Sequence, residues 1–460
     1  MIRMRKVIVR DRSFYKELLI IAAPIILQNI ITIGVNMMDT IMLGSFGEVQ
    51  LSGSSLANDF INIFQILCMG MGNGAAVLTA QFYGAGNQDG LKKTAVIMLK
   101  FALITGSLFT VADLFFPSGI LSIYTKDPEV IAAGAVYLRW SLPTFLLTAF
   151  SLTLTQVLRS VKTVKIPLYA SIISFFFNIF FNWVFIFGNL GAPRMEIAGA
   201  AVGTVIARVA EFVIIVGYFF FQDKKIHFQI SDLSRIDTGD VNRLFFHFSI
   251  PVMLSDSLLG FGNSAVSVVV GHMGAGFTAA YAIIGVIQRF TTVFTSGIGA
   301  AAHTLTGNRV GEGRKQQAYD EAITMLIISI VLGISGGIFI RLAGPLFLKL
   351  YNITADTMTT AMEMLDAVAI MIVFQAMQSV ITKGILRGGG DTKFAMLIDA
   401  VFMWIISVPL GWYAGIVAGA DAFTVFICLK IDWAIKSVIG SIRIVSGRWI
   451  HTINSAAAEG

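Results

Sequence analysis

Charged side chains are scarce in this chain. Only 13% of its 460 residues are Asp, Glu, Lys or Arg, whereas 56% are hydrophobic. Soluble domains carry about 25% charged residues, and the mean hydropathy of this chain is +0.79. The shortage of charge excludes a soluble domain and predicts an all-α integral membrane protein with many spans.

Cysteines and catalytic motifs are equally scarce. Cys68 and Cys428 both lie inside apolar stretches, so no disulfide framework is predicted. The sequence has no Walker motif, His-Glu zinc pair or nucleophile elbow. Its glycine-rich strings at 84–86, 311–313 and 388–390 are predicted to end helices rather than to bind phosphate. We therefore expect neither an enzyme nor a bound cofactor.

Long apolar stretches are what the sequence has in abundance. A helix needs about 20 apolar residues to cross a membrane, and twelve stretches qualify. The first six are 18–43, 56–83, 94–116, 131–158, 167–187 and 197–221, and the second six are 245–271, 279–305, 322–342, 362–386, 394–414 and 423–444.

Lys and Arg are distributed unequally between the two ends of these stretches. With the N-terminus in the cytoplasm, the inner segments and inner helix ends hold 22 of them, and the outer ones hold 4. The positive-inside rule then predicts that both termini are cytoplasmic. Topology thus accounts for the net charge of +6, and no nucleic-acid partner is expected.

The sequence repeats itself once. A shift of 227 residues superimposes Pro24 on Pro251 and Gly44 on Gly271, and aligns "LTAQFYGAG" with "LTGNRVGEG". Parallel repeats of this kind are typical of secondary transporters. We predict twelve transmembrane helices in two pseudo-symmetric six-helix lobes, 1–221 and 244–460, joined by a cytoplasmic linker at 222–243.

The first half carries polar residues that the second half lacks. Asp39 lies inside the first predicted span, and Asn178 and Asn182 share one face of the fifth. Their counterparts in the second half are Val266, Ile405 and Pro409. Because helix packing tolerates apolar residues at these positions, the polar set in the first half needs another reason.

Depth in the membrane supplies that reason. Asp39, Asn182 and Thr204 lie about 7, 9 and 12 Å from the outer ends of their helices at 1.5 Å per residue. A carboxylate, two amide oxygens and a hydroxyl suit a hard cation, and a buried carboxylate can carry a proton. We predict a cation or proton site of Asp39, Asn178, Asn182 and Thr204. The alternative interpretation is interhelical hydrogen bonding.

Other polar residues within the spans have less specific roles. Asp256, Gln375 and Gln378 are candidates to line a substrate cavity. Two pairs have intrahelical spacing, and they are Arg208 with Glu211 and Asp432 with Lys436. Residues near span ends are expected to reach water or the inner surface, and they are Asp113, Asp366, Asp399, Lys383 and Arg387.

Several strings together resemble the bacterial type of the multidrug and toxic compound extrusion (MATE) family over nearly the whole chain. In the first half they are "DTIMLG", "LTAQFYGAG", "LRSVKTVKIPLY", "SIISFFFNIFFNWVFIFG" and "IAGAAVGTVIAR". In the second half they are "GIGAAAHTLTGNRVGEG" and "ILRGGGDTK". Their order, spacing and repetition make the resemblance specific.

The resemblance implies two six-helix lobes around a V-shaped cavity and export of amphipathic, often cationic compounds in exchange for H⁺ or Na⁺. It implies a first-lobe cation site at Asp39, Asn178, Asn182 and Thr204. The NorM-like branch also uses carboxylates of spans seven and ten. Here Asp256 lies about one turn before the first of these positions, and Gln375 or Ala376 occupies the second.

We therefore expect a secondary active multidrug efflux antiporter, a monomer in the cell inner membrane that contacts small drug-like substrates and the lipid bilayer. One alternative is a flippase for a lipid-linked saccharide or another amphiphile of the same superfamily, for which a cationic cavity and often further spans are expected. The other is an integral membrane enzyme, which needs a catalytic cluster at a membrane face. The coupling ion, H⁺ or Na⁺, stays open.

Overall fold

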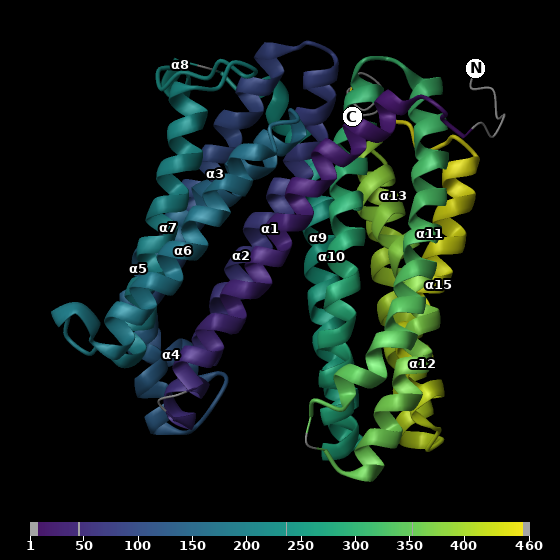
Figure 1. The fold of residues 1–460 in the computed structure, drawn as a ribbon. Coiled ribbons are helices and arrows are strands. Elements are labelled where there is room, and N and C mark those ends of the chain that lie inside the picture. Colours follow the sequence, from purple (N-terminus) through teal and green to yellow (C-terminus); the bar gives the residue numbers. More distant parts are fainter. Residues whose placement is uncertain (1–7, 45–46, 236, 352, 454–460) are drawn as a thin grey trace. The chain divides into compact units, whose positions relative to one another are not determined.

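The computed structural model describes residues 8–44, 47–235, 237–351 and 353–453, and every regular element within these ranges is a helix (Figure 1). The first half of the sequence forms α1 (Arg12–Gly44), α2 (Glu48–Gly84), α3 (Gln88–Phe115), α4 (Pro117–Ser122), α5 (Pro128–Ser160), α6 (Lys165–Phe187), η1 (Asn189–Gly191), α7 (Glu196–Phe221) and α8 (Asp232–Arg235).

The second half begins with the long helices α9 (Gly239–His272), α10 (Ala275–Gly311), α11 (Lys315–Leu348) and α12 (Ala355–Gln378). The π-helical segment η2 (Ser379–Leu386) follows α12, and α13 (Thr392–Val401), η3 (Phe402–Ser407), α14 (Val408–Trp412) and η4 (Tyr413–Val417) make the next long segment. The last long helix is α15 (Ala422–Val445).

Eleven helical segments of the described chain are long and apolar enough to cross a membrane. The twelfth predicted span, 423–444, is a helix as well, because it lies within α15. This helix falls outside the apolar set because Lys430, Asp432 and Lys436 lie close together in its middle. The predicted all-helical membrane fold is therefore confirmed.

Local sequence explains where the helices of the first half begin and end. Asp127 caps α5 by accepting a hydrogen bond from the N–H of Glu129 at 2.9 Å, and Pro128 occupies the first helical position. Gly188 ends α6 with a φ of +75°, a conformation that glycine adopts without strain. These ends fix where the polar residues of α6 lie along the helix.

The chain forms two compact units. Unit 1 comprises 1–26, 80–86 and 250–460, and unit 2 comprises 27–79 and 87–249. This division differs from the expected lobes, 1–221 and 244–460, chiefly because two short segments of the first half pack with the second. Their contacts explain why.

The start of α1 and the end of α2 are held by polar contacts within unit 1. Glu17 accepts a hydrogen bond from Arg309 at 2.7 Å, and the amide of Gln81 donates to the carbonyl of His451 at 3.1 Å. Both α1 and α9 pass from one unit to the other within two residues of a proline, Pro24 and Pro251. A proline removes one helical hydrogen bond, so each helix is weakest where its packing partners change.

Each unit has its own apolar core. In unit 2, Phe64 and Phe145 meet edge to face at 5.2 Å, between α2 and α5. In unit 1, residues of α10, α12 and α15 form the core, and Ile284, Val368 and Phe426 are among them. Separate cores allow each unit to hold polar groups of its own in its interior.

Candidate cation site

The four residues predicted as a cation or proton site lie together in unit 2. Asp39 is near the C-terminal end of α1, Asn178 and Asn182 are on α6, and Thr204 is on α7. Asn182 Nδ2 donates to Asp39 Oδ1 at 2.6 Å and to Asn178 Oδ1 at 3.3 Å. Asn178 Nδ2 donates to Thr204 Oγ1 at 3.4 Å. One continuous hydrogen-bonded chain thus joins three helices.

Glycines in α7 allow α6 to come close enough for these contacts. A Cβ added at Gly203 would lie 2.1 Å from Asn182 Oδ1, and one at Gly199 would lie 2.5 Å from the carbonyl carbon of Phe185. The two glycines are four apart, the small-residue spacing that brings membrane helices together. The sequence "GAAAG" in α7 therefore positions Asn182 against Asp39.

The site is largely closed to solvent. Asn182 is fully buried and Asn178 is 2% exposed, whereas Asp39 and Thr204 are half-buried. Arg208, one turn after Thr204, interacts electrostatically with Asp39. It also forms the predicted intrahelical pair with Glu211, at 2.5 Å. The Asp39 carboxylate therefore has a cation nearby that is already shared with another acid.

Sequence reasoning missed two neighbours of the site. The hydroxyl of Tyr137, on α5, is hydrogen-bonded to Thr204 and to Asn58 of α2, and the Tyr137 side chain is 3% exposed. Comparing the two halves would have found both residues, because a shift of 227 places Tyr137 on Met364 and Asn58 on Gly285.

One acceptor of the site has no partner. Asn182 Oδ1 is buried and lacks a hydrogen-bond donor among the described residues. Leaving such an acceptor unsatisfied costs about 1–3 kcal/mol. A small cation, or a proton carried by Asp39 with the Asn182 amide turned over, would satisfy it. The donor set of one carboxylate, two amides and a hydroxyl therefore fits either coupling ion.

The three residues predicted to line a substrate cavity have different neighbours in unit 1. Asp256 accepts from Arg387 at 2.8 Å. Gln375 Oε1 accepts from Gln288 at 3.3 Å. The amide of Gln378 lies 3.5 Å from Asp399 Oδ1. Asp256 is half-buried, and its role as a cavity residue stays a prediction.

Three residues expected near water or at the inner surface are buried instead. Asp113 and Asp399 have no exposed surface, and Arg387 is only 2% exposed. Arg387 is enclosed because it pairs with acidic residues of other helices. Asp366 does reach the surface, where it pairs with Arg341 at 3.0 Å. The predicted pair of Asp432 and Lys436 is confirmed at 2.8 Å.

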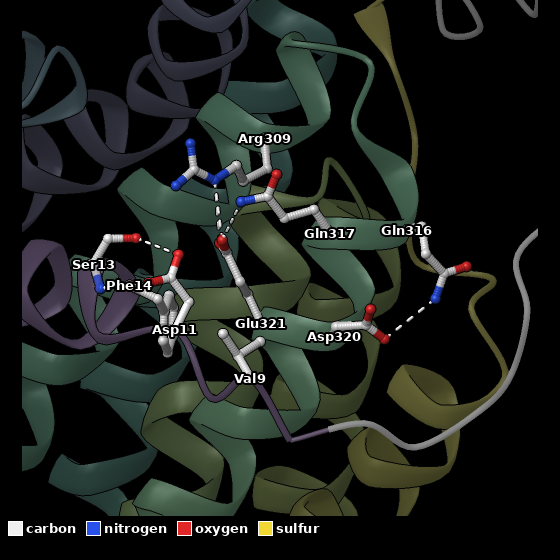
Figure 2. Close-up of a pocket in the computed structure, with 9 residues that line it drawn as sticks. All are labelled: Val9, Asp11, Ser13, Phe14, Arg309, Gln316, Gln317, Asp320 and Glu321. Atoms are coloured by element: carbon white, nitrogen blue, oxygen red, sulfur yellow. Dashed lines mark hydrogen bonds and ion pairs between the residues drawn. The ribbon is translucent and has the colours of Figure 1, made fainter.

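A separate pocket of about 400 Å³ lies where the start of the chain meets α10 and α11 (Figure 2). Its lining residues are Val9, Asp11, Ser13, Phe14, Arg309, Gln316, Gln317, Asp320 and Glu321. Ser13 donates two hydrogen bonds to Asp11, which lower the pKa of that carboxyl. None of the predicted site residues lines this pocket.

Comparison with known proteins gives a consistent result. A family model described as MatE matches residues 24–184 and 251–413, and the two matches begin 227 residues apart, at the two repeat prolines. "Probable multidrug resistance protein NorM" of Thermotoga maritima is 23% identical over 94% of this chain and 93% of its own length. "Multidrug resistance protein NorM" of Vibrio vulnificus is 23% identical over 97% of each chain.

Solved structures resemble the fold. "Crystal structure of MATE in the straight conformation" has a TM-score of 0.85 at 18% identity, over 95% of this chain and 97% of that one. "Outward-facing conformation of a multidrug resistance MATE family transporter of the MOP superfamily" has a TM-score of 0.84 at 18% identity, with the same coverage.

Proposed function

The chain belongs to the MATE family, and we propose that it is a secondary active exporter of amphipathic or cationic organic compounds. Export is driven by the entry of H⁺ or Na⁺. The names of the relatives as multidrug resistance proteins support this class of substrate. The eleven apolar helices support a multi-pass membrane location. We assign the protein to the cell inner membrane as a monomer.

Ion coupling is proposed to take place at Asp39, Asn178, Asn182 and Thr204. The observation that carries this proposal is the 2.6 Å hydrogen bond between Asn182 and Asp39, which connects α1 to α6 inside unit 2. A carboxylate held among amides in a membrane interior is expensive as a free charge. Protonation or Na⁺ binding neutralises it, so the bound and free states differ in energy at this position.

That difference is proposed to select between two conformations. The ion-bound state draws α1, α6 and α7 together around Asp39, whereas the drug binds the other state better. Ion and drug then exchange because each favours one state, as linkage requires. Pro24 lies two residues before the point where α1 changes unit, so α1 can bend there while its C-terminal half stays packed.

The deciding experiment is transport by the purified full-length chain in proteoliposomes. Efflux of a fluorescent organic cation is measured under an inward H⁺ gradient alone and under an inward Na⁺ gradient alone. We expect one of the two gradients to drive efflux well above that of protein-free liposomes. Absence of drug movement under both gradients, with movement of a lipid-linked saccharide instead, would replace the exporter by a flippase.

Orientation is proposed from the distribution of Lys and Arg, with both termini and residues 222–243 in the cytoplasm. Ser231 is in this segment, and its hydroxyl is 3.5 Å from Gln229 Oε1. A Ser231→Cys variant should resist an impermeant thiol reagent added to intact cells and react after the membrane is opened. Labelling in intact cells would reverse the assigned orientation.

A further inference from the structure

Five charged side chains meet in the interior of unit 1, and we call them the charge cluster: Asp256, Arg387, Asp399, Asp432 and Lys436. Arg387 Nη2 lies 2.8 Å from Asp256 and 3.7 Å from Asp399. Lys436 Nζ lies 3.4 Å from Asp399 and 2.8 Å from Asp432. The cluster joins α9, the residue after η2, α13 and α15, and these labelled helices can be followed in Figure 1.

Neutral groups complete the hydrogen bonding of the cluster. Ser255 donates to Asp399 Oδ2 at 2.8 Å and accepts from Arg387 at 3.0 Å. Ser407 donates to Asp432 Oδ1 at 2.9 Å. These hydroxyls orient the carboxylates but bring no charge.

The charges of the cluster do not balance. It contains three carboxylates and two cations, so its formal charge is −1 when all five groups are ionised. Four of the five members are almost fully buried, and the Asp256 side chain is 17% exposed. A net charge in a membrane interior costs several kcal/mol unless a partner neutralises it.

Other charged groups near the cluster do not supply the missing positive charge. Lys430 is on the same helix, but its Nζ lies over the rings of Tyr281 and Trp433, at 5.9 and 5.3 Å from their centroids. Lys383 is exposed. His303 of α10 is buried beside Arg387 and Asp256, and it is the one uncharged titratable neighbour named here.

We propose that the charge cluster of unit 1, together with His303, binds one proton. The site is distinct from that of Asp39, which lies in the other compact unit. The proton belongs to the cluster as a whole, since strongly interacting groups titrate together. Asp256, the most exposed member, is the entry point. The described residues contain no group of three His, Cys, Asp or Glu side chains suited to a metal ion, which favours a proton.

This proposal concerns the charge state of the fold and does not depend on the transported compound. Folding takes up one proton at pH values where the unfolded carboxyls are ionised, so stability falls as pH rises. For one proton, the folding equilibrium constant changes about tenfold per pH unit. Unfolding midpoints of the purified full-length protein in detergent, measured from pH 5 to pH 9 without substrate, report this dependence.

The variants test a rule of charge counting. An Asp39→Asn background first removes the carboxyl of unit 2. In that background, Asp256→Asn, Asp399→Asn or Asp432→Asn each leaves two cations and two carboxylates, so each alone should abolish the fall in stability. The matched control is Asp366→Asn, which removes an exposed carboxylate paired with Arg341 and should leave the fall unchanged.

An independent readout is the infrared band of a protonated carboxyl group, or the ring signals of a protonated His303. One of the two should be present in the Asp39→Asn protein and lost in the three cluster variants. If Asp399→Asn fails to fold, Asp256→Asn at the exposed edge decides alone. The proposal is overturned if the pH dependence of the Asp39→Asn protein persists in the cluster variants that fold. Gradient-driven efflux is measured separately, so failure of this proposal leaves the exporter assignment standing.

Discussion

The two compact units keep buried charge in different ways. Unit 2 holds the Asp39 carboxylate among the amides and hydroxyl of α6 and α7. Unit 1 holds three carboxylates and two cations in one cluster. The helices that carry these groups are related by the internal repeat. The comparison therefore shows that one framework of helices accommodates two different polar interiors.

The repeat relates the two interiors residue by residue. In unit 2, Arg159 donates to Gln28, and Gln28 donates to Ser171 at 2.9 Å. In unit 1, Arg387 donates to Ser255, and Ser255 donates to Asp399 at 2.8 Å. Shifts of 227 or 228 residues superimpose Arg159 on Arg387, Gln28 on Ser255, Ser171 on Asp399, Thr204 on Asp432 and Arg208 on Lys436.

Charge balance distinguishes the two sets. In unit 2, the cations Arg159 and Arg208 are matched by the acids Asp39 and Glu211. In unit 1, the corresponding cations face three acids. Adding a proton to Asp39 therefore creates a net positive charge, whereas adding one to the charge cluster removes a negative charge. Ion binding should thus affect the two units in opposite ways.

The largest expected effect is on transport, and it tests whether unit 2 alone holds the coupling carboxylate. Asp39→Asn should leave the protein folded and able to bind drug, but efflux should fall to that of protein-free liposomes because no group remains to be neutralised. Asn178→Ala with Asn182→Ala should impair efflux strongly. Folded yield, drug affinity and gradient-driven efflux are measured on each variant.

The control for these variants is Asp366→Asn, an exposed carboxylate in the other unit, which should transport like the parent protein. Wild-type efflux from a stable Asp39→Asn protein would make Asp39 a hydrated helix-end residue. Intact efflux in the double asparagine variant, with none in Asp256→Asn, would move coupling to unit 1.

The second effect is on stability, and it tests the cost of charge in unit 1. Lys436→Met leaves one cation with three buried carboxylates. Breaking a buried ion pair in this way costs about 3–5 kcal/mol, so the unfolding midpoint or the folded yield should drop sharply. Lys383→Met, an exposed lysine of the same unit, should change stability by less than about 0.5 kcal/mol.

The counterpart of Lys436 sharpens this comparison. Arg208 has a 27% exposed side chain, so water can replace part of its interaction with Glu211. Arg208→Met should therefore cost less than Lys436→Met. Equal costs for the two substitutions would mean that the balance of charge does not distinguish the units.

The sequence predicted the Asp39 site because its signals are local. Asn178 and Asn182 share a helix face, and depth follows from counting residues inward from Gly44 and Gly188. Helix rise is nearly constant, so such counts locate residues well where helices are regular. The mutual hydrogen bonds of Asp39, Asn182 and Asn178 agree with that count.

The charge cluster was not predicted because its members come from four separate segments. Asp399 and Arg387 lie near span ends in the sequence, where water is the expected neighbour. The π-helical turns of η2 precede Arg387, and a π-helix changes the face on which later residues lie. The C-terminal segment then covers this region, since His451 N donates to Gly389 O at 2.8 Å. Neither feature is apparent from hydrophobic periodicity.

A third and smaller effect tests how closely α6 and α7 must approach. Gly203→Ala would place a methyl group 2.1 Å from Asn182 Oδ1, so the asparagine must move. Overpacking of this kind costs about 1–3 kcal/mol, and it should also weaken ion coupling. Gly217→Ala is the matched control on the same helix, because nothing lies within 4 Å of its added Cβ. Equal efflux in both variants would show that the position of Asn182 does not matter.

The smallest effect separates the two coupling ions. Thr204→Val keeps the shape of the side chain and removes a hydroxyl that accepts from Asn178 at 3.4 Å. Losing such a hydrogen bond inside a membrane protein costs about 0.6 kcal/mol on average. Thr153→Val is the control, because that buried hydroxyl bonds to Ala149 O at 2.7 Å on the same helix as Tyr137. Both variants should therefore remain folded.

The two ions need the Thr204 hydroxyl for different reasons. Na⁺ requires several oxygen ligands, and the hydroxyl is one of only a few at this site, so Thr204→Val should raise the Na⁺ concentration for half-maximal efflux. A proton requires only the Asp39 carboxyl, so H⁺-driven efflux should change little. The measurement is the dependence of efflux on each ion for Thr204→Val and Thr153→Val. A weakened Na⁺ response in Thr204→Val alone assigns Na⁺ to the site. An unchanged response to the driving ion excludes Thr204 as a ligand and reduces the site to Asp39, Asn178 and Asn182.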